Sequence, residues 1–270
     1  MKNSKNGPLA SVIITNYNKS NFLIHAVKSC IEQNYKKKEI IFFDDKSTDN
    51  SLIKIRELNK VTKQKIKIIT NPNKKKNFPT LNHIEAIKKG LKKTKGKYVF
   101  LLDSDDYFHK NKIKEIIEIF NKNEKIQFVL NNPILKYKKR EIKKKFVLNI
   151  SKNRWPKFPP TSCMCFEKKT LVNVLKKIEP KKFPNLAIDF RLAVYFSVIL
   201  KKFYIHQSYL TFYRQVEDGM DSKYNKYRSK EWWIRRNEAF EFLNILLKKN
   251  NLPLNRSLDF FVTRLLNNIL

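Results

Sequence analysis

Apolar and polar positions alternate in blocks over the first hundred residues. Apolar runs of strand length are separated by polar turns and by segments whose apolar residues recur at helical spacing. This order predicts βαβ units and a mainly parallel sheet. The predicted strands are 9–15, 39–43, 65–70 and 97–102, and the helices between them carry their apolar residues at 23–31, 52–58 and 81–91.

The pattern loosens after this region. The charged stretch 137–145 and the aromatic, proline-rich stretch 155–160 indicate a loop or lid. Regular elements are then expected again. We predict helices at 113–120, 168–178, 187–200 and from about 229 onward, and strands at 126–130, 162–166, 203–206 and 209–213.

Polar clusters follow three of the first four predicted strands. They are Asn16 to Ser20, the pair Asp44 and Asp45, and the run from Asp103 to Asp106. Ser20 is expected to cap the following helix. Because ligands bind at the carboxyl ends of strands in open α/β sheets, the three clusters together predict a nucleotide-binding crevice.

The composition fits one folded chain with a substantial core. The 270 residues are 41% hydrophobic and 13% aromatic, which argues against disorder. No apolar stretch approaches ~18 residues and no signal peptide is apparent, so we expect a cytoplasmic protein. Cys30, Cys163 and Cys165 lack zinc-site spacing and are interpreted as reduced core thiols.

The formal net charge of +34 raises the question of an anionic partner. Only ten of the 58 basic residues are arginine, the residue that nucleic-acid recognition favours, and the lysines are spread along the whole chain. We therefore expect no nucleic-acid partner. Peripheral contact with an anionic membrane at its inner face stays open.

The run Asp103, Ser104, Asp105, Asp106 gathers carboxylates whose mutual repulsion a cation would relieve. Their oxygens suit Mg²⁺ or Mn²⁺, which also bind diphosphates. On these residues alone, a solvated acidic turn that caps the next helix is an equal alternative.

Three blocks together resemble glycosyltransferase family 2 in order and spacing. They are Ser11 to Asn18, Asp44 to Asp49, and Gly96 to Asp106. The resemblance covers roughly residues 8 to 215. It implies a GT-A fold, an α/β Rossmann-like mainly parallel sheet flanked by helices, with a helical C-terminal appendage. The implied catalytic domain is 1–228, with a nucleotide-binding half 8–106 and an acceptor-binding half 107–228, followed by a helical extension 229–270.

The resemblance also implies residue roles. Asp105 and Asp103 would form the metal-diphosphate motif, with Asp106 behind them, and Asp45 would accept a hydrogen bond from uracil. The late Tyr213-Arg214 pair would lie near the diphosphate or the closing loop. The full nucleotide-binding set is Thr15, Asn16, Tyr17, Asp44, Asp45, Lys88, Asp103, Ser104 and Arg214.

The chain departs from the family pattern at several positions. Lys46 replaces a customary Gly, and Ala86-Ile87-Lys88 replaces Ala-Arg-Asn, which leaves nucleotide and sugar identity open. Lys88 is a candidate phosphate contact, although a plain surface lysine is the alternative.

The family's general base is a carboxylate at the start of a helix, and Asp189 fits, with Ile188 in place of the usual Glu. An acceptor hydroxyl must lose its proton as it attacks, and a positioned Asp can take it. The alternative is an Asp that stabilises the helix through its dipole. Glu179 is a weaker substitute for the base.

Other polar and aromatic residues are assigned less specific roles. A loop after Arg214 is expected to order on donor binding, and each histidine is interpreted as a surface or packing residue. The tryptophan pair is assigned to packing or to docking. These residues are Asp218, Asp221 and Lys223 in the loop, His25, His83, His109 and His206, and Trp232 with Trp233.

The resulting hypothesis is a metal-dependent inverting hexosyltransferase. It would move a sugar from a nucleotide donor, by resemblance a UDP-sugar, to a glycan or lipid-linked acceptor in surface polysaccharide biosynthesis. A sugar nucleotidyltransferase would need a Gly-rich loop, which Asn16 to Ser20 lacks. A non-catalytic basic module that binds membrane or nucleic acid on a degenerate GT-A scaffold is the other alternative.

Overall fold

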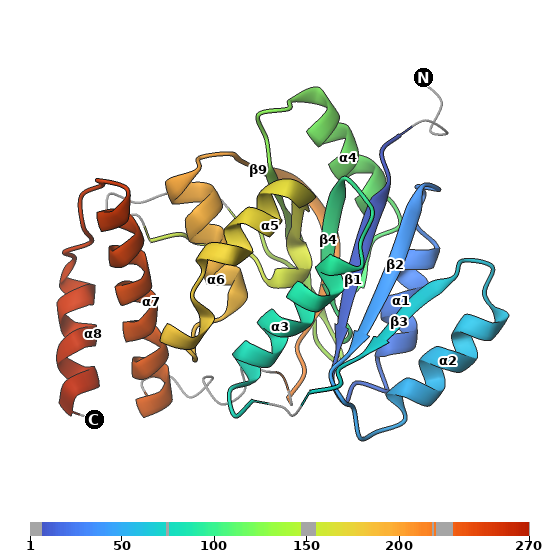
Figure 1. The fold of residues 1–270 in the computed structure, drawn as a ribbon, viewed down its shortest axis with the longest axis horizontal. Coiled ribbons are helices and arrows are strands. Elements are labelled where there is room, and N and C mark those ends of the chain that lie inside the picture. The colour runs from blue at the N-terminus through green and yellow to red at the C-terminus, as the bar shows by residue number, and fades with distance from the viewer. Residues whose placement is uncertain (1–6, 74–75, 147–154, 218, 220–228, 270) are drawn as a thin grey trace.

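The computed structural model describes residues 7–73, 76–146, 155–217, 219 and 229–269. Its centre is one mixed sheet, whose strands follow the order β3-β2-β1-β4-β8-β6-β9-β5 in the described residues, with β7 paired to β6 (Figure 1). The expected α/β class is confirmed by this arrangement of a sheet between layers of helices.

The first half of the sheet is parallel. Its strands are β1 (Ala10–Asn16), β2 (Lys38–Asp44), β3 (Ile66–Thr70) and β4 (Tyr98–Asp103). Strand β1 lies between β2 and β4, so Thr15 is opposite both Phe43 and Asp103. The carboxyl ends of these strands therefore meet at one edge of the sheet.

The second half is mixed. Strand β8 (Met164–Glu167) runs antiparallel to β4, and β6 (Phe128–Lys136) runs antiparallel to β8. Strand β9 (Phe203–Arg214) then pairs in parallel with β6. The short strands β5 (Tyr107–Phe108) and β7 (Glu141–Lys143) add antiparallel to β9 and β6.

Helices cover both faces of the sheet. Because side chains alternate along a strand, Val12 and Ile14 enter one core while Ile13 enters the other. Helices α1 (Leu23–Ile31), α2 (Ser51–Val61) and α4 (Lys112–Lys122) contribute to the first core. Helices α3 (Pro79–Lys92), α5 (Lys168–Lys177) and α6 (Ile188–Ala193) contribute to the second.

Two long helices end the chain, α7 (Lys230–Lys249) and α8 (Leu258–Ile269). Phe242 and Leu243 of α7 belong to the same core as α3, α5 and α6, so α7 packs directly onto that face. Within the described ranges, no helix is both long and apolar enough to cross a membrane.

Several local predictions were wrong, for physical reasons. Ser20 does not cap α1; the helix begins at Leu23, and the Ser20 amide instead donates to Asp49. The strands predicted at 203–206 and 209–213 form one strand, β9, because an irregularity in its pairing with β6 keeps it continuous. Part of the expected lid at 137–145 is β7, whose charged side chains point to solvent.

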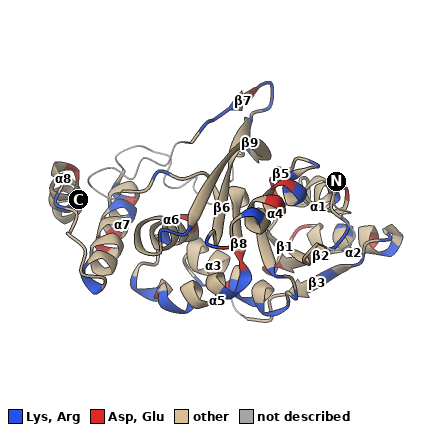
Figure 2. Cartoon of the chain, turned by 90° about the horizontal axis from the view of Figure 1, so that it is seen from above, with Lys and Arg blue, Asp and Glu red and all other residues tan. Residues whose placement is uncertain are grey.

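Other predictions are confirmed. The three cysteines are buried free thiols, and burial raises the pKa of Cys30 and Cys163 to about 12. The strand predicted at 162–166 begins only at Met164, however, because Cys163 lies in a short 3₁₀ turn, Thr161–Cys163. Lysine and arginine side chains occur on most elements rather than along a single stripe (Figure 2).

Candidate active site

A cleft of about 610 Å³ opens at the carboxyl edge of β1, β2 and β4. Its first wall comes from the loops after these strands and from α3, and its second from α6, the 3₁₀ turn before β8 and the end of β9. The predicted site residues that line it are Thr15, Asn16, Tyr17, Asp45, Asp103, Ser104, Asp105, Asp189 and Arg214.

Asp103 is held by hydrogen bonds from three elements. Its Oδ1 accepts from Thr15 Oγ1 at 2.9 Å and lies 3.0 Å from His83 Nε2, and its amide donates to Ser162 Oγ at 3.0 Å. Burial would raise the pKa of Asp103, but His83 and Thr15 outweigh it, so the pKa is lowered. This carboxylate is therefore ionised in the cleft.

Asp105 faces Lys19, whose Nζ lies 3.5 Å from its Oδ2. Burial and the neighbouring charge of Asp103 nevertheless raise the pKa of Asp105. Asp106 is fully buried behind it, and burial together with Asp105 and Asp103 raises its pKa well above the ordinary value. The negative charges of three neighbouring carboxyl groups therefore repel one another, and each raises the cost of ionising the next.

These carboxylates fit a divalent cation. Asp103 and Asp105 both present oxygens to the cleft, and magnesium and manganese sites commonly use one or two carboxylates, with phosphates and water as further ligands. Among the described residues no group of three or more His, Cys, Asp or Glu side chains is placed to hold a metal. The residues present therefore suit a cation shared with a diphosphate rather than a closed structural site.

The loop after β2 is stabilised internally. Asp44 is fully buried, accepts from Asn16 Nδ2 at 2.8 Å and from the amide and hydroxyl of Ser47, and does not line the cleft. Asp45 does line it, and its Oδ1 accepts from Asn71 at 2.6 Å. Asp44 thus shapes the loop that presents Asp45.

Lys46 has a left-handed backbone, with φ of 58°. A side chain in this region costs about 1–2 kcal/mol, which glycine avoids. The family's customary Gly at this position therefore has a conformational explanation, and this chain carries the cost.

Arg214 closes the cleft at the end of β9. Its amide donates to Asp106 Oδ1 at 2.9 Å, and its Nη1 donates to the Asp105 carbonyl at 2.6 Å. The guanidinium lies 4.6 Å from the Tyr107 ring centre, and its Nη2 is 2.6 Å from His25 Nδ1. The late arginine is therefore bound to the acidic motif itself.

Asp189 lies in the first turn of α6, and its Oδ1 accepts from the Phe190 amide at 2.7 Å. The same side chain lines the cleft. The two interpretations of Asp189, helix stabilisation and a role in the cleft, are therefore geometrically compatible.

Arg191 anchors the segment before α6. Its guanidinium is fully buried and donates to the carbonyls of four residues, with Nη1 2.7 Å from the oxygen of Ile178. Burial lowers the pKa of Arg191 to about 10. The other three carbonyls belong to Pro180, Phe183 and Leu186.

Helix α7 fixes the same segment from outside. Glu238 accepts from the amide of Asn185 at 2.8 Å and from its side-chain Nδ2 at 2.7 Å. The Trp155 ring packs between Phe190 of α6 and Phe240 of α7, at centroid distances of 4.9 and 4.3 Å. The position of Asp189 therefore depends on α7.

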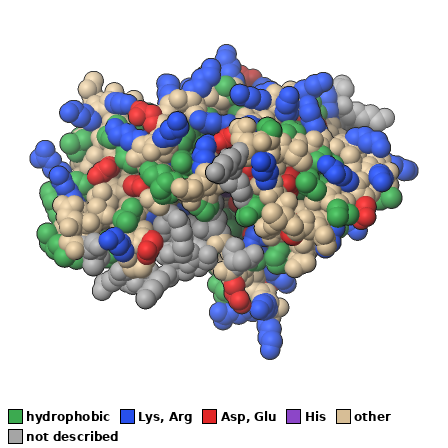
Figure 3. Space-filling view, turned by 60° about the horizontal axis from the view of Figure 1, so that its bottom comes forward, with side chains coloured by type: hydrophobic (Ala, Val, Ile, Leu, Met, Phe, Trp, Pro, Cys, Tyr) green, Lys and Arg blue, Asp and Glu red, His purple; other side chains and the backbone are tan. Residues whose placement is uncertain are grey.

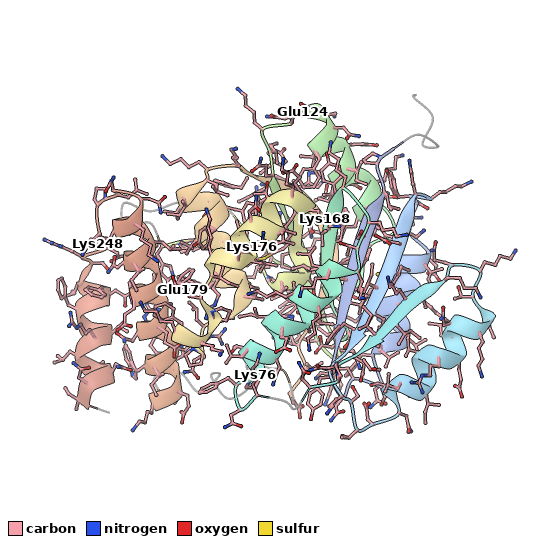
Figure 4. The ribbon with its side chains drawn as sticks, in the orientation of Figure 1. Lys76, Glu124, Lys168, Lys176, Glu179 and Lys248 are labelled. Atoms are coloured by element: carbon pink, nitrogen blue, oxygen red, sulfur yellow. The ribbon has the colours of Figure 1, made fainter. Side chains whose placement is uncertain are left out.

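Two expected residues lie elsewhere. Lys88 lines a separate hollow of about 550 Å³ beside α3, together with Glu179. Glu179 pairs with Lys249 of α7 at 3.0 Å and lies on the outer surface (Figure 4). The loop residues Asp218, Asp221 and Lys223 lie outside the described residues.

Sequence reasoning missed Lys19 and His83 as parts of the cleft. Lys19 stands in the first polar turn, a position that pointed to the site, but it is one cation among 58. His83 carries no local signal, because only the packing of α3 brings it to Asp103. His25 and Trp233 do have packing roles, since His25 stacks on Tyr107 and Trp233 is buried.

Comparison with known proteins agrees with this geometry. The family model described as glycosyl transferase family 2 matches residues 11–177. An uncharacterised glycosyltransferase from Nostoc sp. is 29% identical over 76% of this chain and 64% of its own length. The UDP-Glc:alpha-D-GlcNAc-diphosphoundecaprenol beta-1,3-glucosyltransferase WfaP of Escherichia coli is 37% identical over 46% of this chain and 45% of its own length.

The chain thus spans less than two thirds of each of these relatives. Among solved structures, TarS from S. aureus in complex with UDP-GlcNAc superposes with a TM-score of 0.67 at 18% identity, covering 96% of this chain and 70% of that one. The likeness confirms the expected GT-A fold, with its curled mixed sheet and helical C-terminal segment.

Proposed function

The chain belongs to glycosyl transferase family 2, and we propose that it transfers a hexose from a nucleotide diphosphate donor to an acceptor hydroxyl with inversion. The observation that carries this proposal is one cleft lined by both the Asp103–Asp105 motif and Asp189. A single displacement requires a leaving-group site and a base at the same cleft.

The first wall would bind the donor. Tyr17 offers an exposed ring to the base, and Asp45, fixed by Asn71, offers a carboxylate oxygen to a ring N–H such as that of uracil. Asp103 is held ionised by His83 and Thr15. These features favour a UDP-sugar, the donor class named for WfaP and bound in the TarS structure.

Asp105 and Asp103 would hold Mn²⁺ or Mg²⁺ together with the diphosphate. When bound, the cation supplies Lewis-acid neutralisation of the diphosphate charge. Lys19 lies at the Asp105 carboxylate and Arg214 at the Asp105 backbone carbonyl, so both would add positive charge beside the leaving group.

Asp189 would act from the second wall. It takes the proton of the acceptor hydroxyl as the acceptor oxygen bonds to the anomeric carbon. The bond from that carbon to the diphosphate breaks in the same step, and its electron pair leaves with the diphosphate. Attack from the face opposite the leaving group inverts the configuration.

One relative supports the proposed acceptor class. WfaP acts on a lipid-linked N-acetylglucosamine diphosphate, so we propose a glycan or lipid-linked acceptor in surface polysaccharide biosynthesis, met at the cytoplasmic face of the membrane. In this proposal residues 1–228 are the catalytic domain, with halves 8–106 and 107–228, and 229–270 form an extension that packs on it.

The test compares wild-type protein with Asp189→Asn, which keeps the shape and removes the basic lone pair. With UDP-glucose or UDP-GlcNAc, Mn²⁺ and GlcNAc-diphosphoundecaprenol, we expect transfer to fall by about 10²–10⁴. UDP binding, measured by calorimetry, should stay within about twofold. Equal transfer by the variant would exclude Asp189 as the base. Wild-type protein that neither binds nucleotides nor turns them over would favour the non-catalytic alternative.

A further inference from the structure

Helix α8 presents an apolar stripe to solvent. Five apolar side chains along one side of the helix are between 39% and 80% exposed. Their spacing of three and four residues places them on one face. They are Leu258, Phe261, Val262, Leu265 and Ile269.

The opposite face of α8 is attached to α7 mainly through polar groups. Arg236 of α7 pairs with Asp259 and donates from Nε to Thr263 Oγ1 at 3.2 Å. Phe260 adds an edge contact with Phe240, at 5.5 Å between ring centres. A surface helix normally buries its apolar stripe and exposes its polar face, and α8 does the reverse.

The turn before α8 fixes this orientation. Asn244 of α7 bonds both the amide and the carbonyl of Asn255, and Asn255 in turn accepts from the amide and hydroxyl of Ser257. The side chain of Ser257 then accepts from the Phe260 amide, so the start of α8 is locked. The outward apolar stripe is therefore a property of a well-anchored helix.

We propose that this stripe docks on an anionic lipid bilayer, with α8 lying along its surface. The positive net charge of the chain favours an anionic bilayer over a second copy of the chain as the partner. A second copy would be another chain of net charge +34, which repels the first, whereas anionic headgroups complement that charge. A helix with an exposed apolar stripe can lie in the plane of the interface with that stripe buried at the headgroup boundary.

The surroundings of the stripe support this orientation. Arg264, exposed on α8, adjoins the stripe, and Arg256 precedes the helix. Lys248 at the end of α7 points outward on the same side of the molecule (Figure 4). Figure 3 shows hydrophobic side chains at the edge where α7 and α8 lie, with basic side chains around them. Apolar groups can thus enter the headgroup region while basic groups pair with phosphates.

The test measures co-sedimentation of the full chain with vesicles of phosphatidylcholine containing about one third phosphatidylglycerol. The variant Phe261→Ser with Leu265→Ser keeps the charge and removes two large members of the stripe. We expect its vesicle partition coefficient to fall at least about tenfold, because each buried apolar side chain contributes about one order of magnitude. Wild-type binding should also weaken on pure phosphatidylcholine and at high salt.

Asn268→Ser on the same helix is the matched control, and its binding should equal that of the wild type. Thermal midpoints of all variants should agree, because the replaced side chains are solvent-exposed. Unchanged vesicle binding by the double variant would overturn the proposal. A wild-type dimer in sedimentation equilibrium that the double variant abolishes would assign the stripe to a second copy instead. The vesicles contain no sugar acceptor, so this outcome is independent of whether the chain transfers sugar.

Discussion

On the wall formed by β1, β2, β4 and α3, the functional side chains hold one another, whereas Asp189 on the second wall is positioned by groups that do not line the cleft. Asp103 is bonded directly by Thr15 and His83. The segment before Asp189 is fixed through backbone groups by Arg191 and Glu238.

This difference predicts which property a substitution on each wall should change, binding or turnover. A change on the first wall removes an atom proposed to bind the donor or its metal, and should abolish that binding directly. A change behind the second wall shifts Asp189 without removing it, so under the proposed function it should reduce turnover more than donor binding. Four predictions sharpen this contrast, in order of decreasing effect.

The largest effect is expected from Asp105→Ala. Loss of a metal-binding carboxylate should remove the extra thermal stabilisation that UDP gives in Mn²⁺ over that in chelator, and reduce transfer by about 10²–10³. Differential scanning fluorimetry measures the first effect. Asp259→Ala, on α8, is the control and should keep it. A full Mn²⁺ effect in Asp105→Ala would move the metal site elsewhere.

Glu238→Gln should separate turnover from binding. Gln has one acceptor oxygen and cannot accept both hydrogen bonds from Asn185, which should cost about 1–3 kcal/mol of unfolding free energy and lower kcat about tenfold. The donor KM should stay within about twofold. Glu241→Gln on the exposed side of α7 is the control. A rise in donor KM with unchanged kcat would contradict the separation of the two walls.

The pH dependence of stability should show whether the ionised form of Asp106, on the first wall, is disfavoured in the fold. The pKa of Asp106 is raised by burial, so its stabilising contribution is complete below the unfolded pKa and is lost as pH rises through the folded pKa. In chelator, Asp106→Asn should therefore gain on the wild type in thermal midpoint from pH 4 to pH 8.

Asp49 supplies a control of opposite sign. Hydrogen bonds from Ser20 and Ser51 outweigh burial and lower its pKa, so its contribution is present above the unfolded pKa and is lost as pH falls. Asp49→Asn should lose stability relative to the wild type near neutral pH and converge with it in acid. If the thermal midpoints of wild type and Asp106→Asn changed in parallel with pH, the pKa of Asp106 would not be raised in the folded protein.

The smallest effect is expected from Lys46→Gly. It relieves the left-handed backbone and should stabilise the protein by about 0.5–1 kcal/mol after the entropy cost of glycine. Lys60→Gly, the same change in the last turn of α2, should destabilise it by up to about 1 kcal/mol. Urea unfolding measures both. A loss of stability in both variants would show that Lys46 makes a compensating contact.

The contrast between the walls also explains what sequence could predict. Strands β1 to β4 could be predicted because the apolar run of each strand and the turn after it can be recognised in a stretch of about ten residues. Asp189 was found only through a family resemblance. His83, Arg191 and Glu238 could not be assigned, because their roles arise from packing between segments far apart in the chain; Glu238 lies 53 residues from Asn185.

The attachment of α7 to the segment before Asp189 has a consequence for synthesis of the protein. All of β1 to β4 has been synthesised once Asp106 leaves the ribosome, so their pairing, which joins Thr15 to Asp103 across 88 residues, can precede the synthesis of α7. Asn185 must wait for Glu238, which is translated later. The residues proposed to hold the donor are therefore synthesised before the helix that fixes the segment of Asp189, and under the proposed function a product stopped before α7 would lack a fixed base.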